Sequence, residues 1–347
     1  MNTHQCAYAK INLLLHVCSK RPDGYHELSM IMESISIHDD LEISVSDEPG
    51  IHLTCRIEGK NLSEEVSLSN GDDNLVTKAA KAILNYARGL NGAATDKIRL
   101  SDIAIDVISG RLGLNIVLTK RIPMAAGLAG GSTDAAAALR GINELLELGL
   151  GTQELCSIGV SIGADVPYCI RGGSCLAEGI GEKLTPVASP PAAHLLIVKP
   201  SIDVPTGNVY VRFDERTSAS AGSGTYNRGS CPKCFTPGIS DDGAASNPNA
   251  EADTPDARMI QALEDGELTA IGSSLYNDLR IVTAADHGII TELEDLLTDA
   301  GAAGAMMSGS GPSVFGLFDQ KDQCLMAMKR VRDIYPGIYA EYAEFVI

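Results

Sequence analysis

A glycine-rich loop near the middle of the chain has the residue types of a phosphate site. Three glycines fall within the five residues 127–131, and Ser132, Thr133 and Asp134 follow directly before a run of alanines. Glycine lets a ligand approach the main chain closely. The first turn of a helix adds unpaired N–H groups at the positive end of its dipole. The loop therefore predicts a nucleotide-phosphate site, with a glycine-rich turn that caps an ordinary helix as the alternative.

Two common phosphate fingerprints do not fit this loop. A P-loop needs lysine and then serine or threonine directly after its last glycine, whereas Gly131 is followed by Ser132 and Thr133. The dinucleotide motif needs the spacing Gly-x-Gly-x-x-Gly, whereas the glycines here are spaced Gly127-x-x-Gly130-Gly131. What remains is the pattern Pro-x-x-x-Gly-Leu-x-Gly-Gly-Ser-x-Asp-Ala-Ala.

Four other residues have types that could do chemistry. Lys10 is a cation in an apolar, strand-like stretch, where it either reaches solvent or supplies a functional amine. Tyr25 and His26 follow a basic Pro-Asp-Gly turn, and they form either ordinary surface or a site for a planar, anionic ligand. Asp165 lies in an irregular turn, where an aspartate either caps the turn or acts as a base.

Hydrophobic periodicity indicates the elements that must position these residues. Alternation predicts strands within 30–58 and at 103–107 and 114–118, and the last of these leads into the glycine loop. The helix after the loop has an apolar face with 3.6-residue spacing. Further elements are expected as strands at 6–18, 195–198 and 314–318, as helices near 76–87, 153–162, 258–268 and 292–300, and as a second glycine-rich segment at 307–313.

Composition excludes some classes of function. The chain has 347 residues, of which 44% are hydrophobic, and its formal net charge is −18. So acidic a chain is a poor non-specific nucleic-acid binder, and no nucleic-acid partner is expected. No apolar run reaches membrane-spanning length and residues 1–17 lack a signal-peptide pattern, so we expect a cytoplasmic protein. Its nine cysteines have no framework spacing and are expected to be reduced.

A domain boundary is expected at Pro190-Pro191, which gives an N-terminal domain at 1–190 and a C-terminal domain at 191–347. Residues 214–257 have few large apolar side chains, which predicts a mobile insertion. Cys231 and Cys234 lie inside it, but a zinc site needs about four ligands and no partner is near in sequence. The sequence therefore assigns no residue as a metal ligand.

Three motifs together resemble the galactokinase, homoserine kinase and mevalonate kinase (GHMP) superfamily. They are Ala9-Lys10-Ile11-Asn12, the glycine loop, and Met307-Ser-Gly-Ser-Gly-Pro312, in that order. Three more stretches, at 20–27, 163–168 and 177–182, resemble one branch of kinases whose alcohol substrate carries cytidine diphosphate. The likeness covers residues 7–210 and 258–318.

The resemblance implies an α+β fold of two domains with the active site in the cleft between them. The N-terminal domain would bind ATP and resemble a small-subunit ribosomal protein, and the C-terminal domain would be α/β-plait-like. The implied activity is ATP- and Mg²⁺-dependent phosphorylation of the 2-hydroxyl of the substrate, in isoprenoid precursor biosynthesis. Asp165 would accept the hydroxyl proton, with Lys10 beside it. The ATP site would comprise Asn74, Lys120, Pro123, Ala125, Ala126, Gly127, Leu128, Ala129, Gly130, Gly131, Ser132 and Thr133.

The resemblance also implies a substrate site. Asn12 would lie beside the substrate hydroxyl, unless it is a buried asparagine bonded to backbone. Tyr25 would stack on the cytosine and His26 would read the edge of the base. A second aromatic residue is expected from the stretch 190–196, where this chain offers only His194.

Three assignments for the ATP site and the neighbouring Asp134 carry alternatives or departures. As alternatives to a role in the ATP site, Asn74 could be a helix cap and Lys120 could be a solvated strand end. Ala129 stands where the family often has glycine, which predicts a negative φ there. Asp134 adds negative charge near the phosphates, which predicts that it points away and caps the helix.

Two rival functions remain. One is a sister kinase for homoserine, mevalonate or a related alcohol, and the turn before Tyr25 and His26 disfavours it because an acyclic alcohol offers nothing to stack. The other is a non-catalytic metabolite sensor on the same fold, which the presence of Lys10 and Asp165 disfavours. A small-molecule substrate, no membrane, and a monomer or homodimer are expected.

Overall fold

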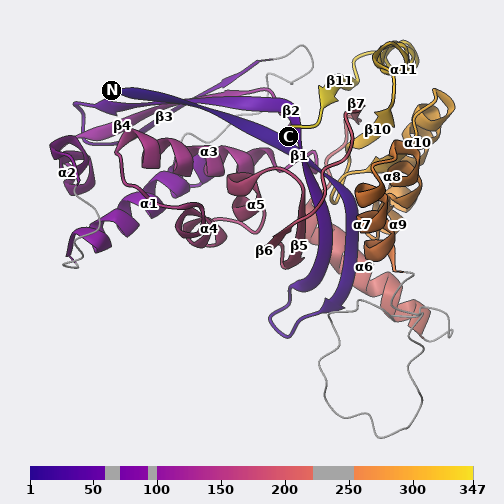
Figure 1. Cartoon of the computed structure of the whole chain (residues 1–347), viewed down its shortest axis with the longest axis horizontal. Coiled ribbons are helices and arrows are strands. Elements are labelled where there is room, and N and C mark those ends of the chain that lie inside the picture. The colour runs from indigo at the N-terminus through magenta and orange to yellow at the C-terminus, as the bar shows by residue number, and fades with distance from the viewer. Residues whose placement is uncertain (59–70, 93–99, 222–253, 347) are drawn as a thin grey trace, which may run out of the picture. The chain divides into compact units, whose positions relative to one another are not determined.

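The computed structural model describes residues 1–58, 71–92, 100–221 and 254–346 (Figure 1). Contacts divide the chain into two compact units. The first comprises Met1–Lys10, Ser34–Met124 and Leu128–Gly172. The second comprises Ile11–Glu33, Ala125–Gly127 and Gly173–Ile347.

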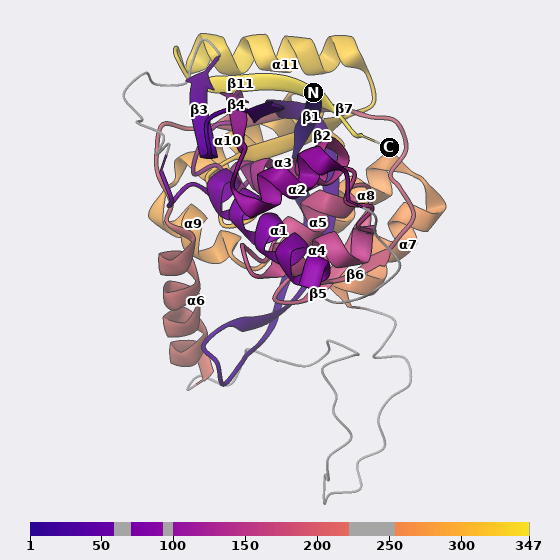
Figure 2. The same ribbon diagram turned by 90° about the vertical axis from the view of Figure 1, so that its left-hand side faces the viewer.

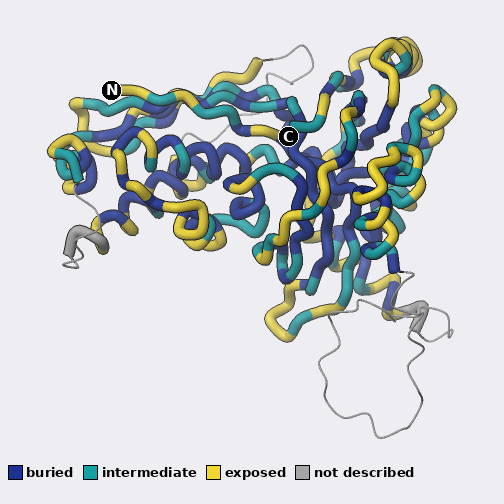
Figure 3. The backbone as a smooth tube through the Cα atoms, in the orientation of Figure 1, coloured by how far each residue is buried: buried dark blue, intermediate teal, exposed yellow. Residues whose placement is uncertain are grey.

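The first unit is a sheet with helices along one of its faces (Figure 1). The strand order is β3-β4-β2-β1, with β3 parallel to β4 and β4 antiparallel to β2. Alternate residues of the strands are buried against α1 and α3, whose apolar faces have helical spacing (Figure 3). The elements are β1 (Asn2–Lys20) and β2 (His26–Ser46), which both continue into the second unit, β3 (Gly50–Ile57), β4 (Gly113–Lys120), α1 (Leu75–Gly92), α2 (Asp102–Ser109), α3 (Gly130–Leu145), α4 (Thr152–Val160) and α5 (Val166–Arg171).

The strand predicted at residues 103–107 is wrong, because this segment forms helix α2. The Ser101 side chain accepts a hydrogen bond from the Ala104 N–H, and Gly110 ends the helix in the left-handed region with φ 81°. These are the helix start and stop signals of a serine cap and a glycine after the last turn. The buried residues Ala104, Val107 and Ile108 have helical spacing, so the alternating isoleucines were misleading.

The second unit contains the second half of β1, the first part of β2 and a separate four-stranded sheet. Strand β5 is antiparallel to β2, β6 is antiparallel to β5, and the short β8 is parallel to β1. The separate sheet has the order β11-β7-β10-β9, and α10 and α11 pack on it (Figure 2). The elements are β5 (Cys175–Gly179), β6 (Lys183–Pro186), β7 (His194–Lys199), α6 (Thr206–Ala221), α7 (Pro255–Asp265), α8 (Leu268–Ser274), β8 (Tyr276–Asn277), α9 (Arg280–Asp286), α10 (Ile289–Asp299), β9 (Gly304–Met307), β10 (Val314–Phe318), α11 (Lys321–Ile334) and β11 (Tyr339–Glu344).

The two ends of the expected insertion at 214–257 are helical. Helix α6 continues to Ala221, and α7 begins at Pro255 with Thr254 as its cap. Cys231 and Cys234 lie outside the described residues. The seven cysteines that the structure describes are all free. Among the described helices, none is both long enough and apolar enough to span a membrane.

Candidate active site

Lys10 and Asp165, the predicted catalytic pair, lie together in the first unit. The Lys10 Nζ is 3.9 Å from the Asp165 Oδ2, and the Lys10 side chain is 6% exposed whereas that of Asp165 is 32% exposed. Asp165 precedes α5, but its side chain makes no capping hydrogen bond. The turn-cap reading of Asp165 therefore does not describe this structure. Its carboxylate is accessible and has a buried ammonium beside it.

The glycine loop leads into the first turn of α3, as predicted. Thr133 is the first residue of α3 whose N–H bonds within the helix, to the Ala129 carbonyl at 2.9 Å. The N–H groups of Gly130, Gly131 and Ser132 therefore have no partner inside the helix. The Thr133 hydroxyl donates to the Tyr8 carbonyl at 2.7 Å, which anchors this turn on β1. The turn thus presents three N–H groups to an anion.

The expectation that Ala129 has a negative φ is wrong. Ala129 has φ 57° and Ala125 has φ 48°, so both alanines adopt the left-handed region. Gly127 has φ 73°, and a Cβ built on it would lie 2.3 Å from the Ser308 carbonyl oxygen. Glycine is required at 127 by this close approach, whereas at 129 the chain tolerates an alanine in a conformation that usually favours glycine.

Lys120 is buried and bonds two carboxylates, so it is not a solvated strand end. Its Nζ donates to the Asp134 Oδ2 at 2.6 Å and also to the Asp39 Oδ2. The other oxygen of Asp39 accepts the N–H groups of Arg121 and Ile122. We call Asp39, Lys120 and Asp134 the buried triad.

Burial raises the pKa of Asp134 to about 8, against the opposing charge of Lys120. Burial lowers the pKa of Lys120, but the charges of Asp134 and Asp39 outweigh it and the net shift is upward. The predicted capping role of Asp134 is therefore wrong, because its carboxyl group faces Lys120. Loss of hydration on burial explains why one carboxyl group of the buried triad keeps its proton.

Asn74, Lys120 and the glycine turn lie close together in the first unit. The Asn74 Oδ1 accepts the Val76 N–H at 2.9 Å, so the predicted cap of α1 is present. A Cβ built on Gly130 would lie 3.3 Å from the Lys120 Nζ, and one built on Gly131 would lie 3.2 Å from a methyl carbon of Leu75. The start of α1, the end of β4 and the start of α3 thus meet at the N–H groups of the loop.

Tyr25 and His26 lie in the second unit, and His26 contacts helix α6. Tyr25 is 62% exposed. The His26 ring stacks on Tyr210 with centroids 5.0 Å apart, and its Nε2 bonds the Asp214 Oδ1 at 2.8 Å. Lys20 donates to the other Asp214 oxygen at 2.7 Å.

Tyr210 and Asp214 are residues that sequence reasoning missed. Both lie on one face of α6, four residues apart, and only the contacts of α6 with Lys20 and His26 reveal them. His194, the expected second aromatic residue, instead stacks on Tyr342 of β11 and bonds its hydroxyl at 2.7 Å. The ring beside His26 is therefore that of Tyr210.

Asn12 lies in the second unit and is fully buried. Its N–H donates to the Ser308 hydroxyl at 3.3 Å, and that hydroxyl donates to the Gly127 carbonyl at 3.1 Å. The Asn277 amide donates to two carbonyls of the second glycine-rich segment, those of Met307 and Gly309. These bonds fix residues 125–127 of the loop against the segment at 307–313.

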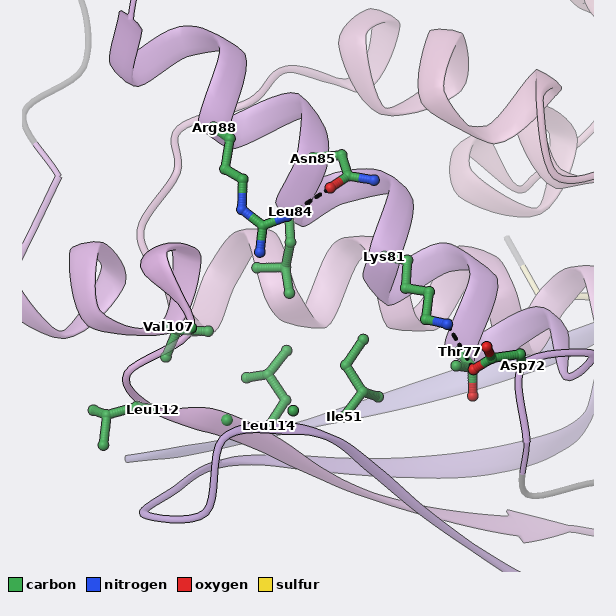
Figure 4. A pocket seen from close by; sticks show the side chains of 13 residues that line it. Ile51, Asp72, Thr77, Lys81, Leu84, Asn85, Arg88, Val107, Leu112 and Leu114 are labelled. Carbon is green, nitrogen blue, oxygen red and sulfur yellow. Dashed lines mark hydrogen bonds and ion pairs between the residues drawn. The ribbon is translucent and has the colours of Figure 1, made fainter.

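A cavity of about 440 Å³ lies between α1, α2 and the first residues of β3 and β4 (Figure 4). Its floor is apolar, with Ile51 and Leu114 among the lining residues. Lys81 lines it and forms an ion pair of 2.6 Å with Asp72. None of the predicted site residues lines this cavity, so it is separate from the ATP site that the sequence predicts.

Comparison with known proteins identifies the family. The family model for the GHMP kinases N terminal domain matches residues 74–173, and that for GHMP kinases C terminal matches residues 259–330. The 4-diphosphocytidyl-2-C-methyl-D-erythritol kinase of Geobacter metallireducens is 37% identical, over 94% of this chain and 92% of that protein. The protein of the same name from Clostridium novyi is 36% identical, over 96% of this chain and 97% of that protein.

Solved structures agree with the sequence matches. A crystal structure of 4-(cytidine 5'-diphospho)-2C-methyl-D-erythritol kinase has a TM-score of 0.65 at 28% identity, and the match covers 99% of each chain. The L. major mevalonate kinase in complex with R-mevalonate has a TM-score of 0.70 at 15% identity, over 99% of this chain and 95% of that one, which shows the shared fold. The predicted α+β GHMP kinase fold is thus confirmed. The sequence matches extend over nearly the full length of this chain and of each relative, and the chain belongs to the 4-diphosphocytidyl-2-C-methyl-D-erythritol kinase family of the GHMP kinases.

Proposed function

We propose that this chain transfers the γ-phosphoryl group of ATP to the 2-hydroxyl of 4-diphosphocytidyl-2-C-methyl-D-erythritol, in isoprenoid precursor biosynthesis. The observation that carries the proposal is the Lys10–Asp165 pair, with its atoms 3.9 Å apart and the carboxylate not used as a cap. The relatives that bear this kinase name match nearly the whole chain. A sensor that had lost its chemistry would not need to keep this pair.

Asp165 is the proposed base. It accepts the proton of the substrate hydroxyl as the oxygen attacks phosphorus, and its half-exposed position leaves room for that hydroxyl. The Lys10 ammonium stabilises negative charge on the transferred group. The backbone of Lys10 is held in place, because its main-chain N–H donates to the main-chain carbonyl of Leu128, in the glycine loop, at 3.2 Å.

The N–H groups of Gly130, Gly131 and Ser132 are the proposed phosphate donors, and Asn74 and Lys120 line the nucleotide site near them. The unpaired helix start fits a polyphosphate, since it offers directed donors and a positive dipole end. Mg²⁺, when bound, neutralises phosphate charge. The Ser132 hydroxyl is its proposed protein ligand, because Mg²⁺ usually keeps several waters and needs few protein groups.

Tyr25, His26 and Tyr210 are the proposed cytosine site. Two tyrosine rings and an imidazole from one unit provide stacking surfaces and a hydrogen-bonding edge. A site for homoserine or mevalonate would have no use for these rings. We further propose a cytoplasmic enzyme, monomeric or homodimeric; the free state of the seven described cysteines fits a reducing compartment.

An ATP-consumption assay with a panel of alcohols tests the proposal. We expect turnover with 4-diphosphocytidyl-2-C-methyl-D-erythritol and none with homoserine, mevalonate or the free methylerythritol phosphate. Turnover of another alcohol with the cytidine-bearing one ignored overturns the substrate assignment. No turnover of any alcohol by protein that still binds ATP favours the sensor reading.

A further inference from the structure

Four side chains with metal-binding atoms meet on one face of the first unit's sheet. His4 and Cys6 come from β1, and His38 and Asp40 come from its neighbour β2. Residues two apart on a strand point to the same face, so each strand supplies one pair. The side-chain donor atoms of His4, Cys6 and Asp40 all lie within 4.8 Å of one another. We call these four residues the outer cluster.

Asp40 is the centre of the outer cluster. Its Oδ1 lies 3.0 Å from the His4 Nε2, 3.9 Å from the Cys6 Sγ and 3.8 Å from the His38 Nε2. Its other oxygen accepts a hydrogen bond from Arg121, which Glu58 holds in turn at 3.0 Å. Asp40 therefore presents an oxygen whose position the Arg121 guanidinium fixes.

His38 has the hydrogen bonding of a metal-bound histidine. Its Nδ1 lies 2.8 Å from the Ser36 carbonyl oxygen, which can only accept, so Nδ1 carries a proton and, in the neutral ring, Nε2 carries the lone pair. Nε2 is the atom that faces Asp40. A backbone carbonyl on one ring nitrogen is the support that orients histidines toward metals. The Tyr8 ring packs edge-on against His38, with centroids 5.3 Å apart, and limits its rotation.

We propose that the outer cluster binds one Zn²⁺ ion, through the His4 Nε2, the Cys6 Sγ, the His38 Nε2 and the Asp40 Oδ1. Two imidazoles, one thiolate and one carboxylate are a donor set of the zinc class, not of the Mg²⁺ class. Bonds of about 2.0–2.3 Å in a tetrahedral site hold the donors about 3.3–3.8 Å apart, so the donor atoms of His4, Cys6 and Asp40, all within 4.8 Å of one another, need only small closing movements. The His38 Nε2 already lies 3.8 Å from the Asp40 Oδ1. His4 supplies the closing movements readily, because its side chain is 54% exposed.

Binding balances as a simple exchange of a proton for a metal. The S–H bond of Cys6 breaks, its proton goes to the buffer, and the thiolate binds Zn²⁺. At His4 the ring proton moves to Nδ1 so that the Nε2 lone pair faces the metal. The ion would tie β1 to β2 at Asp40, the residue after Asp39 of the buried triad, and it is independent of the proposed kinase activity.

The test uses tag-free, full-length protein in which Cys231 and Cys234 are both changed to serine, so that this pair cannot contribute. Titration with Co²⁺ as a spectroscopic probe is expected to give a sulfur-to-metal charge-transfer band and the intense d–d bands of a tetrahedral site. Zn²⁺ is expected to displace Co²⁺ at one equivalent and to raise Tm, whereas Mg²⁺ leaves Tm unchanged. Calorimetry in two buffers is expected to show release of about one proton per ion.

Variants of the outer cluster decide the outcome. Cys6→Ser is expected to abolish the charge-transfer band, and His38→Gln to weaken Zn²⁺ binding by about tenfold or more. Cys156→Ser, which removes a half-buried thiol from α4, is the matched control and is expected to leave the spectrum unchanged. Failure of the parent protein to bind Co²⁺ or Zn²⁺ overturns the proposal. An unchanged spectrum in Cys6→Ser also overturns it.

Discussion

The Lys120 ammonium lies 2.6 Å from the Asp134 carboxyl group, and both side chains are buried. Asp39 bonds the same ammonium from β2. One cation thus joins β2, the end of β4 and the first turns of α3 beneath the glycine loop. Burial raises the pKa of Asp134 to about 8, and the nearby Asp39 carboxylate adds to the rise, while the Lys120 ammonium opposes it.

The first prediction concerns pH. The folded chain holds a proton on Asp134 that the unfolded chain releases above about pH 3.9. The contribution of Asp134 is therefore full below that value and is lost as pH rises through about 8, so stability declines with pH across this window. Asp134→Asn mimics the protonated group and should remove that decline. Urea unfolding of both proteins at several pH values from about 6 to 9 measures the free energy of unfolding. An equally steep decline with pH in Asp134→Asn would contradict the raised pKa of Asp134.

Removal of the central cation of the buried triad should be strongly destabilising. Lys120→Met leaves the Asp39 charge buried without its partner, and breaking a buried pair costs about 3–5 kcal/mol. The double variant Lys120→Met/Asp39→Asn removes both charges, and its amide oxygen can still accept the N–H of Ile122. We expect it to recover a large part of the lost stability in urea unfolding. A double variant as unstable as the single one would show that charge is not the cause.

Asp165→Asn tests the proposed base. The amide keeps the shape of the side chain but cannot take the hydroxyl proton, so kcat should fall by about 10²–10⁴-fold. ATP binding should change by less than about twofold, because the N–H groups of the loop are untouched. Turnover and nucleotide binding are measured on the same preparation. Near-normal turnover would remove Asp165 from the mechanism.

Asp214 is predicted to position His26 for the cytosine. Asp214→Ala removes the acceptor of the His26 Nε2, so the KM for the cytidine-bearing substrate should rise by about tenfold while the KM for ATP is unchanged. Glu215→Ala is the matched control, since it removes the same charge from the exposed side of α6. CMP binding provides a readout that does not depend on turnover. Equal CMP affinities in the two variants would contradict the prediction.

Two substitutions in the glycine loop should differ strongly in their effect on stability. Gly127→Ala forces a Cβ to 2.3 Å from the Ser308 carbonyl oxygen at a positive φ, so it should cost well above about 2 kcal/mol. Ala129→Gly relieves a left-handed alanine and should change stability by less than about 1 kcal/mol. Thermal unfolding of both proteins compares them. A strongly destabilised Ala129→Gly protein would show that its methyl group supports the turn.

The sequence predicted the parts of the site that rest on local spacing. The glycine loop opens a helix, and the motifs that carry Lys10 and Asp165 bring the two side chains together. The helix cap at Asn74 could also be predicted, because an asparagine directly before a run of apolar residues at helical spacing is a local signal. Helix α2 was missed although Ser101 and Gly110 are equally local signals, because alternation was given more weight than the caps.

What the sequence could not show depends on contacts between distant segments. Asp214 pairs with His26 across 188 positions, and Lys120 pairs with Asp39 across 81. Nothing near Asp39 in sequence distinguishes it from a solvated aspartate. Only the register of β2 against β4 brings Asp39 to Lys120. Hydrophobic periodicity does not indicate which charged residues of two strands will pair.

Asp39 and Asp40 are consecutive and face opposite sides of the sheet. One meets the buried Lys120, and the other meets the partly exposed Arg121, its neighbour on the opposite segment. A slip of β2 by one residue in one direction would put Asp40 opposite Lys120 and take it away from Arg121, whereas a slip in the other direction would put His38 opposite Lys120. Either slip separates at least one of the two ion pairs that the native alignment makes. Two adjacent aspartates, each with its own cation on the neighbouring segment, thus tie the register of β2 against β4 to two consecutive charges.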